Sequence, residues 1–589
     1  MSSMIRKNIA MDLAANGGAG ILGYSGALNY AAGSIGAFLH ESCINVRNFP
    51  WLAAGDGITD DTAAIQAAAN AATGRTLFLP GTSASYKITD DINLLSNTTV
   101  FGEGRGTVVK LAASNKNGFI ASGKTNVIVR DLVILSDVVS TAAYIGGVNF
   151  YGSVKCRSIN VECIGMSWAG VLINGSNYCQ VSRCRFSAWL GNIQDAADIC
   201  VYKNSNFNII TNNHCFGGGD HGIFIQDPVV GDTPTGNIVT ANVVGEHKAY
   251  GIALYVTTAY DTRTVISNNV VSDILGTQLF GASGAGIFIQ SGGGSVVTGN
   301  TVYNCCRSTT NFETLGMGGI SAAIGEYESG TGVEIIISNN HVHALRGPGI
   351  HAVASNRGIT IDGNTIKSTG TTAVRGEAIL VSNVSAVRVT NNTIRHANPN
   401  YYALRVTAVN AEYSYHNIAG NTVVCANSAG GITVNEAGTG LQRNVIVHGN
   451  TVFGALSNPA YMFSKAPNLR FSDNLGESSG IVFSLANSAK SRLTGNRLAS
   501  GSNTYSILFS GANTGSVADE SNDFDGIVEN DPASGVIISS YGSAPKAYGT
   551  GLWEVGDRVI QSVPIVGNPK GWRCTANGYP GTWVSEGNL

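Results

Sequence analysis

A short alternation of apolar and polar positions recurs between residues 333 and 452 and predicts the repeating unit of this chain. Each copy has an apolar, β-branched run, a small or polar residue, an asparagine and, two positions later, another apolar residue. The asparagines are Asn340, Asn364, Asn392, Asn421 and Asn450, which are separated by 24, 28, 29 and 29 residues. A period of this size is typical of a solenoid, and the alternation within each copy predicts β-strands.

The repeat continues in both directions along the chain. The same slot holds Asn300, Asn269, Asn242, Asn213, Cys184, Glu162 and Asp131 upstream, and Asn474 and Asn496 downstream. We expect the asparagines to stack, one per coil, at a bend whose left-handed backbone Asn tolerates. A second phrase recurs beside each copy, a Gly followed by Ile or Val and an alternating strand, and we expect this Gly to form a tight corner.

Two or three short strands per coil, each paired with the coils above and below, predict an all-β fold, the parallel β-helix. Its core needs apolar strands without inward charges, which fits a chain that is 43% hydrophobic and only 12% charged. We expect four parts: a lead-in segment (1–45), an opening region with a capping helix (46–120), the β-helix (121–530) and a small C-terminal β module (531–589).

Composition disfavours several classes of function. The net charge of −3 gives no electrostatic basis for binding nucleic acid or an anionic membrane. The eleven cysteines lack zinc-site spacing, and we expect small buried thiols formed in a reducing compartment. Residues 13–39 carry no charge, but seven glycines interrupt them, so we expect neither an export signal nor membrane insertion.

The segment before the repeat has a different pattern. Residues 55–57 (GDG) predict a turn, and residues 59–61 predict polar capping of an Ala-rich helix over 62–72. TLFLP at 76–80 predicts a strand, and TTVFGEGRGTVVKL at 98–111 predicts two more. No helix follows GEGRG, so we interpret it as a strand corner rather than a phosphate-binding loop.

GDGITDDTAAIQAA, followed by LFLPG and FGEGRGT, resembles the opening segment of the pectate-lyase-like superfamily, in particular of bacteriophage tailspike proteins. The resemblance is strong over residues 17–111, where GAGILGYSGAL and SIGAFLHES are similar to a tailspike lead-in. It implies a right-handed β-helix in which Asp56, Asp60 and Asp61 serve the cap and not catalysis. It also implies a homotrimer that is made in the host cytoplasm, joins the virion at the phage tail or baseplate through its N-terminus, and acts extracellularly on a bacterial surface polysaccharide.

The C-terminal part resembles a small β module found at the end of many phage tail fibres and spikes. Trp553, Trp572 and Trp583 lie on its short strands between Gly/Pro turns. They either form the core of the module or present a platform that stacks on sugars or locks a trimer.

Function on a β-helix uses outward positions and loops, because packing occupies the inward positions. Aromatic rings and amides, which suit sugar C–H faces and hydroxyls, recur at one outward position of the Gly-Ile strands. An incidental polar column is the alternative. The column runs Tyr151, Asn174, Tyr202, Gln226, Tyr255 and Gln290.

Acidic residues gather around the same coils, among them Asp195 and Asp198 before one strand and Glu246 before another. A glycosidase needs two carboxylates that flank the scissile bond, although each acid alone also fits a turn. We expect Asp227 to act with Asp261 or Glu326, and Asp220 to form a second pair with His221. The substrate-binding candidates are Tyr202, His221, Gln226, Tyr255, Arg263 and Gln290. We expect no cofactor and no metal, because His341 and His343 share a strand face without a matching carboxylate.

Three functions compete. The first is a tailspike depolymerase that hydrolyses capsule or O-antigen with paired carboxylates. The second is a polysaccharide lyase on the same fold, with His221, Tyr255 or Arg263 supplying the base. The third is an adhesin that grips glycan without cleaving it. Trimerisation would bury the outward apolar side chains of Leu172, Phe224 and Phe288 against neighbouring subunits.

Overall fold

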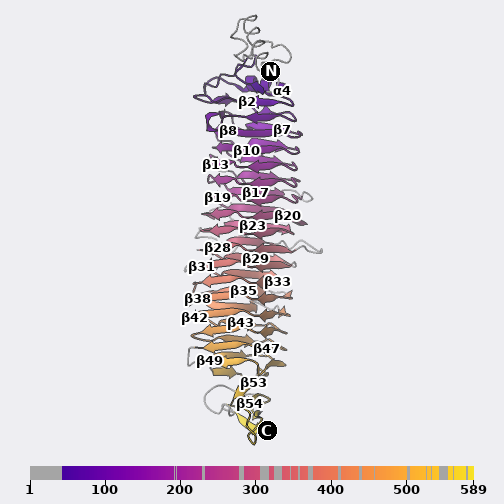
Figure 1. The fold of residues 1–589 in the computed structure, drawn as a ribbon, viewed down its shortest axis with the longest axis vertical. Coiled ribbons are helices and arrows are strands. Elements are labelled where there is room, and N and C mark those ends of the chain that lie inside the picture. The colour runs from indigo at the N-terminus through magenta and orange to yellow at the C-terminus, as the bar shows by residue number, and fades with distance from the viewer. Residues whose placement is uncertain are drawn as a thin grey trace, which may run out of the picture. The chain divides into compact units, whose positions relative to one another are not determined.

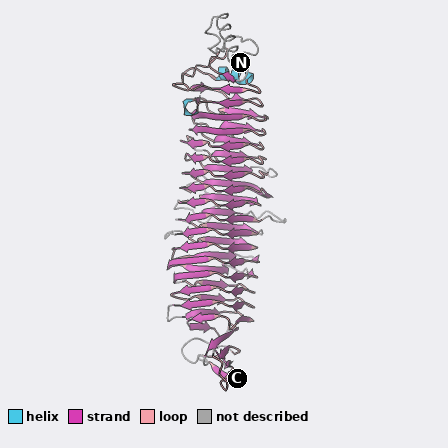
Figure 2. Ribbon diagram, viewed as in Figure 1, coloured by secondary structure: helices cyan, strands magenta, loops and turns pink. Residues whose placement is uncertain are grey.

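The computed structural model describes most of the chain from residue 43 to its end. The described residues are 43–48, 50–190, 193, 195–227, 233–276, 284–305, 318–323, 334–344, 347–355, 358–368, 376–408, 413–436, 441–456, 458–500, 505–525, 527–531, 534–542, 555–561, 563–578 and 581–589. The chain divides into two compact units, residues 1–247 and 248–589. Each unit is a stack of coils made of short parallel strands (Figures 1 and 2).

A coil contributes one strand to a first sheet, then one strand on each side of the asparagine bend to a second and a third stack. In the first unit the first sheet contains β4 (Ile92–Asn93), β7 (Phe119–Ser122), β9 (Gly146–Tyr151), β11 (Ala169–Asn174), β14 (Ala197–Tyr202) and β17 (His221–Asp227). The second stack contains β1 (Cys43–Asn45), β2 (Thr76–Phe78), β5 (Thr99–Phe101), β12 (Gln180–Ser182), β15 (Ile209–Thr211) and β18 (Ile238–Thr240). The third contains β3 (Tyr86–Ile88), β6 (Val108–Leu111), β13 (Arg185–Ser187), β16 (His214–Phe216) and β19 (Val243–Gly245), while β8 (Ile128–Ser136) and β10 (Arg157–Ile164) run through both.

The second unit repeats this plan. Its first sheet contains β20 (Tyr250–Asp261), β23 (Ala285–Gly293), β26 (Gly318–Ala323), β29 (Ile350–Ser355), β32 (Ile379–Val384), β35 (Tyr402–Ala408), β39 (Gly430–Glu436), β43 (Tyr461–Ser464), β46 (Phe483–Ala486), β49 (Tyr505–Ser510) and β52 (Ile527–Asn530). Its second stack contains β21 (Val265–Ser267), β24 (Val296–Thr298), β27 (Ile335–Ser338), β30 (Ile359–Asp362), β33 (Val387–Thr390), β37 (Asn417–Ala419), β41 (Ile446–His448), β44 (Arg470–Ser472), β47 (Arg492–Thr494), β50 (Ser516–Ala518) and β53 (Val536–Gly542). The third contains β22 (Val270–Ser272), β25 (Thr301–Tyr303), β28 (His341–Ala344), β31 (Thr365–Ser368), β34 (Thr393–His396), β38 (Thr422–Ser428), β42 (Thr451–Leu456), β45 (Leu475–Ser478), β48 (Arg497–Ser500) and β51 (Asp523–Asp525).

The asparagine ladder forms as the repeat predicts. In the second unit it runs without interruption from Asn269 to Asn522, each Nδ2 donating to the Oδ1 of the next ladder residue at 2.8–3.0 Å. In the first unit Asn213 donates to Asn242 in the same way. The left-handed residue is not the ladder asparagine but the one before it, such as Asn339 or Asn391.

Two of the expected ladder positions are wrong. The strand register aligns Cys184 with Val161 and Val161 with Leu132, so Glu162 and Asp131 lie one residue off the ladder. A shift of one residue turns a side chain to the other face of a strand. Both acids face outward: Asp131 accepts a hydrogen bond from Asn160, and Glu162 forms a 2.6 Å ion pair with Arg105.

Glycines near the start of first-sheet strands, such as Gly251 and Gly286, are needed for close approach rather than for a special backbone conformation. A Cβ at Gly251 would lie 2.3 Å from Val271 Cγ1, and one at Gly286 would lie 2.4 Å from Val302 Cγ1. Since both valines are core residues, a larger residue at these positions would push the opposite wall of the coil outward.

The core lies inside the coils and consists of the alternate positions of every strand, as Ile199 and Ile223 illustrate with fully buried side chains. Leu172, Phe224 and Phe288, expected to be exposed and to become buried only in a trimer, are already buried within one chain. The ring of His221 covers Phe224 at a centroid distance of 4.2 Å, and Tyr250 stacks on Phe288 at 4.5 Å. These residues therefore supply no exposed apolar surface for trimerisation.

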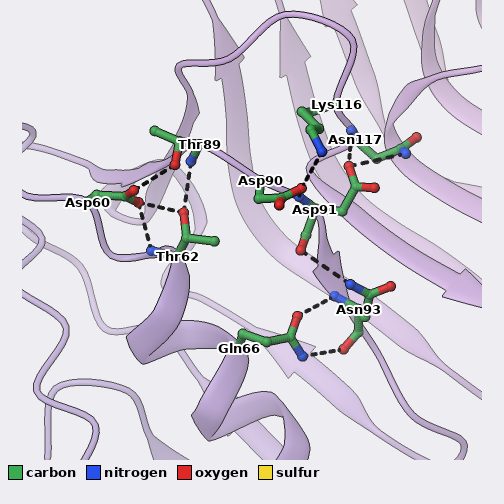
Figure 3. A network of polar contacts seen from close by, with 9 residues as sticks. All are labelled: Asp60, Thr62, Gln66, Thr89, Asp90, Asp91, Asn93, Lys116 and Asn117. Carbon is green, nitrogen blue, oxygen red and sulfur yellow. Dashed lines mark hydrogen bonds and ion pairs between the residues drawn. The ribbon is translucent and has the colours of Figure 1, made fainter.

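The opening region carries the predicted helix, α4 (Thr62–Ala71), followed by a 3-10 turn, η1 (Gly104–Gly106), at the Gly-rich corner. Asp60 accepts hydrogen bonds from the Thr62 backbone N–H and from the Thr62 and Thr89 hydroxyls (Figure 3). These bonds lower the pKa of Asp60. Asp61 turns away from the helix and accepts the Gly55 N–H.

The same network ties α4 to the coils beside it. Gln66 exchanges two hydrogen bonds with the backbone of Asn93, and Asp91 accepts the Asn117 N–H (Figure 3). Asp90 forms a 2.7 Å ion pair with Lys116. The acids of the opening region thus have structural partners.

After β53 the parallel stacking gives way to an antiparallel meander of β54 (Arg558–Gln561), β55 (Gly571–Ala576) and β56 (Thr582–Ser585). Trp572 and Trp583 lie half-buried on β55 and β56, whereas Trp553 lies outside the described residues. One small extra pair, β36 (Tyr413–Ser414) with β40 (Gln442–Arg443), completes the strands.

The ten cysteines of the described chain are free thiols, and all except Cys43 are buried. No described helix combines the length and the apolar character that crossing a membrane requires.

Candidate carbohydrate site

The predicted outward column exists as a register column, but its members differ in exposure. In the first unit Asn174 pairs with Tyr151, Tyr202 pairs with Asn174 and Gln226 pairs with Tyr202; in the second unit Tyr255 pairs with Gln290. Tyr151 and Tyr255 are exposed at 49% and 36%, and Gln290 is half-buried. Asn174, Tyr202 and Gln226 are buried.

Tyr202 is buried because other aromatic rings cover it. Its ring lies 4.5 Å from that of Tyr144 and 6.4 Å from that of Trp168. Tyr144 is itself 45% exposed, so it presents the outer face of this aromatic cluster. Tyr144 has no place in the repeat because it lies in the loop before β9, and the strand pattern gave no signal for it.

Asp195, Asp220 and His221 come together where β14 and β17 begin; we call them the acid–imidazole cluster. The His221 N–H donates to the Ala196 carbonyl at 2.9 Å, which places the two strand starts side by side. The Asp195 N–H donates to Asp220 Oδ2 at 3.1 Å. His221 Nε2 lies 3.8 Å from Asp220 Oδ2 and 3.9 Å from Asp195 Oδ1.

The cluster has one face toward solvent. The side chain of Asp195 is 42% exposed, while Asp220 and His221 are buried. Separations of 3.8–3.9 Å exceed a hydrogen bond, so a hydroxyl or water can bridge the three groups. One ligand atom from each residue lies within 4.8 Å of the others, and this donor set also suits a divalent cation.

The remaining predicted catalytic residues are not part of this cluster. Asp227 ends β17, at the opposite end of the strand from His221, and is fully buried. Asp261 binds Arg263 in a 2.6 Å ion pair, and this contact raises the pKa of the largely exposed Arg263. Glu326 lies outside the described residues.

Cys200 lies in the same sheet and is not a candidate nucleophile. Burial raises the pKa of its thiol to about 12, and the charge of Asp195 adds to this effect. Gln226 Nε2 lies 3.7 Å from the sulfur. The group therefore stays a protonated thiol at neutral pH, and its role is packing.

A second acid near this site has a structural role that the repeat did not reveal. Asp198 lies in register between Gly170 and Gly222, and its carboxylate is fully buried. The Trp189 indole donates to Asp198 Oδ1 at 2.5 Å, and His247 Nε2 lies 3.3 Å from Oδ2. Asp198 occupies a position that holds a glycine in the two neighbouring coils. This difference was the one sign in the sequence that Asp198 faces inward.

Comparisons with known proteins agree with this fold. Residues 43–274 match the sequence model of a family described as rhamnogalacturonase A/epimerase, pectate lyase-like, and residues 272–394 match that of the right-handed β-helix region. The described residues of both ranges form a right-handed parallel β-helix. A comparison with curated proteins gives no match.

Several solved structures are similar to this chain over most of its length. The tailspike protein of E. coli bacteriophage HK620, in complex with a pentasaccharide, is 12% identical over 98% of this chain and 96% of its own, with a TM-score of 0.43. The A-module of the Azotobacter vinelandii mannuronan C-5 epimerase AlgE6 is 18% identical over 70% and 98%, with a TM-score of 0.43. PfbA, a surface adhesin of Streptococcus pneumoniae, is 14% identical over 71% and 92%, with a TM-score of 0.39. At these identities and scores the likeness carries no argument about activity.

Proposed function

We propose that the protein is a bacteriophage tailspike that binds and depolymerises a bacterial surface polysaccharide, either a capsule or an O-antigen. The observation that carries the proposal is the acid–imidazole cluster at the start of β14 and β17, with the exposed carboxylate of Asp195 beside the buried one of Asp220. The resemblance of residues 17–111 to tailspikes and the match of residues 43–274 to a pectate-lyase-like family support the substrate class.

Hydrolysis is the reaction that this geometry favours. Asp195 and Asp220 offer oxygens within 4.8 Å of each other, close to the separation of about 5 Å in retaining glycosidases. Asp195 would give its proton to the leaving oxygen, and Asp220, oriented by the Asp195 N–H, would serve as the second carboxylate. Asp261 and Glu326 remain secondary candidates, with Arg263 as a substrate ligand.

Sugar binding would use the exposed aromatic rings of the first unit. In the second unit it would use the residues of the outward column. We assign the stacking surface to Tyr144 and Tyr151 in the first unit and to Tyr255 with Gln290 in the second. Tyr202 and Gln226 then support this surface from below rather than contacting the sugar.

A lyase is the second candidate, and the imidazole of the cluster favours it. His221 Nε2 lies within 4 Å of a carboxylate oxygen of Asp195 and of one of Asp220. A neutral imidazole can take the proton α to the carboxylate of an acidic sugar, which leads to elimination instead of hydrolysis.

The test is incubation of the full chain with purified capsules and lipopolysaccharides from a panel of bacterial strains. New reducing ends without ultraviolet absorbance establish hydrolysis, and reducing ends with the absorbance of an unsaturated uronate establish a lyase.

We expect Asp195→Asn and Asp220→Asn each to slow cleavage by roughly 10²–10⁴-fold. The control Asp137→Asn, which removes an exposed carboxylate paired with Lys110, should keep the wild-type rate. Binding without cleavage on every strain would leave only the adhesin.

The tailspike proposal includes a homotrimer that attaches to the phage tail through the N-terminal segment. Residues 1–42, to which the attachment is assigned, lie outside the described residues. An apolar stripe on the second stack of the first unit supports self-association: Tyr178 stacks on Phe207 at 5.3 Å, and Ile209 pairs with Ile238. All four side chains are exposed.

A further inference from the structure

A groove in the second unit lies on the second stack of strands and the turns that precede it, away from the first-sheet strands of that unit. We call it the basic groove and define it by Tyr415, Asn444, Asn468, Arg470, Lys490 and Arg492. It encloses a cavity of about 570 Å³. Cavities that hold small ligands commonly have about 300–1,000 Å³.

Two parallel rows of side chains build the groove. Arg470 pairs in register with Ile446 on one side and with Arg492 on the other, so these residues lie on successive coils. The second row lies two residues earlier on the same coils and has left-handed backbone, with φ of 67° at Tyr415 and 59° at Lys490. Since coils are about 4.8 Å apart, four of them give a groove about 14 Å long.

The charge of the groove is one-sided. Arg470, Lys490 and Arg492 are all exposed, and no carboxylate lines the cavity. Within the described chain, none of these three cations forms an ion pair. Arg470 and Arg492 lie directly opposite each other on neighbouring strands and repel, and an anion bound between them would offset this repulsion.

The other lining groups identify the kind of anion. Tyr415 is 70% exposed and offers a ring face, while Asn444 and Asn468 offer amides that pair with hydroxyls. Guanidinium groups bind carboxylates with two parallel hydrogen bonds. His416, at the base, is buried and bonded to Gln442 at 2.6 Å, so it closes the groove instead of entering it.

We propose that the basic groove binds an anionic glycan, a chain whose sugars carry carboxylates, with Arg470 and Arg492 holding the acid groups and Tyr415 stacking on a sugar face. The groove contains no acid–base pair, so it is a binding site and not a second catalytic site. The inference goes beyond the proposed depolymerase and does not depend on it.

The test uses the full chain and isothermal titration with polygalacturonate, neutral dextran and double-stranded DNA. We expect polygalacturonate to bind, dextran not to bind, and Arg470→Gln/Arg492→Gln to weaken binding at least tenfold and to lower its salt dependence. Lys490→Gln should weaken it less. The matched control Arg157→Gln/Arg185→Gln removes two exposed arginines of the first unit and should bind like the wild type.

Several outcomes would overturn the inference. An equal loss of affinity in the Arg157→Gln/Arg185→Gln control would mean that polygalacturonate binds by unspecific charge attraction. Wild-type affinity in the Arg470→Gln/Arg492→Gln variant would mean that these cations are ordinary surface residues. DNA binding as tight as polygalacturonate binding would make the ligand a nucleic acid, and a change of molecular mass in the groove variant would make the groove a subunit interface. Asp195→Asn should keep the wild-type affinity for polygalacturonate. Cleavage and polygalacturonate binding therefore test the depolymerase proposal and the groove proposal separately.

Discussion

His396 and His416 are buried imidazoles of the second unit whose protonation opposes folding. Burial lowers the pKa of each to about 4, against an ordinary value of 6.5. The unfolded chain therefore binds more protons than the folded chain between these values, and stability is complete above about 6.5 and falls as the pH drops toward 4. The loss is on the order of 3 kcal/mol per histidine.

We expect denaturant midpoints measured at pH 7, 5.5 and 4.5 to decline across this window. His396→Gln/His416→Gln should flatten the decline, even if it lowers stability at pH 7, because no imidazole is left to protonate. The control His341→Gln changes an exposed histidine and should leave the slope as it is. An equally steep decline in the double variant would assign the pH dependence to other groups.

Single residues also show which features the sequence alone does not determine. The sequence placed Asp198 among the outward acids, yet its side chain is fully buried. At the start of the strand Asp198 and Ile199, which are consecutive in the chain, both face inward. The sequence paired Asp220 with His221, but only the pairing of β14 with β17 brings Asp195 beside Asp220. Residues that are 25 positions apart become adjacent by stacking, which a single strand does not encode.

The asparagine ladder is the element that holds the bend of each coil. Asn392 is buried, and its Nδ2 donates to the Ile361 carbonyl and to Asn421, while its Oδ1 accepts the Asn364 N–H. Asn392→Ala leaves buried donors and acceptors without partners, at about 1–3 kcal/mol each. We expect destabilisation on the order of 3 kcal/mol.

Unfolding rates in guanidinium are a suitable measurement, because they do not require a refolding equilibrium. Asn392→Ala should unfold faster than the wild type. Thr393→Ala, one residue later and exposed, should unfold at the wild-type rate. If both variants unfold alike, the ladder contributes no more than an ordinary surface position.

Elements were the most predictable part of this chain. The helix expected over 62–72 is observed at Thr62–Ala71, and the strand expected at 76–80 is observed at Thr76–Phe78. A second amide pair, Asn208 with Asn237, escaped detection. It lies in the turn before the second stack, where only two coils carry it and no long period reveals it.

At the scale of the whole molecule, the proposed homotrimer makes a prediction about the apolar stripe. Phe207→Ser/Ile209→Ser removes two of its exposed side chains, and we expect light scattering to shift from the mass of three chains toward that of one. Val139→Ser, an equally exposed apolar residue outside the stripe, should leave the mass unchanged. A trimeric double variant would place the interface elsewhere, and a monomeric wild type would refute the trimer.

The parallel β-helix followed from the amino-acid sequence because its causes are local and repeated. Side-chain alternation, a recurring asparagine and a small residue at each corner act within one coil, and every further coil confirms them. The opening helix and its acids followed for the same reason, since capping involves neighbours in the chain.

The contacts between coils could not be predicted from the sequence and are seen only in the tertiary structure. A register shift of one residue separates an outward Glu162 from an inward Val161. Rings of other coils bury Tyr202, and rings at strand starts bury Phe224, from the same strand, and Phe288, from the neighbouring strand, without a partner subunit. The acid–imidazole cluster and the basic groove arise in the same way, from side chains on successive coils about 4.8 Å apart. Their spacing depends on which coil stacks on which, and no single repeat contains that information.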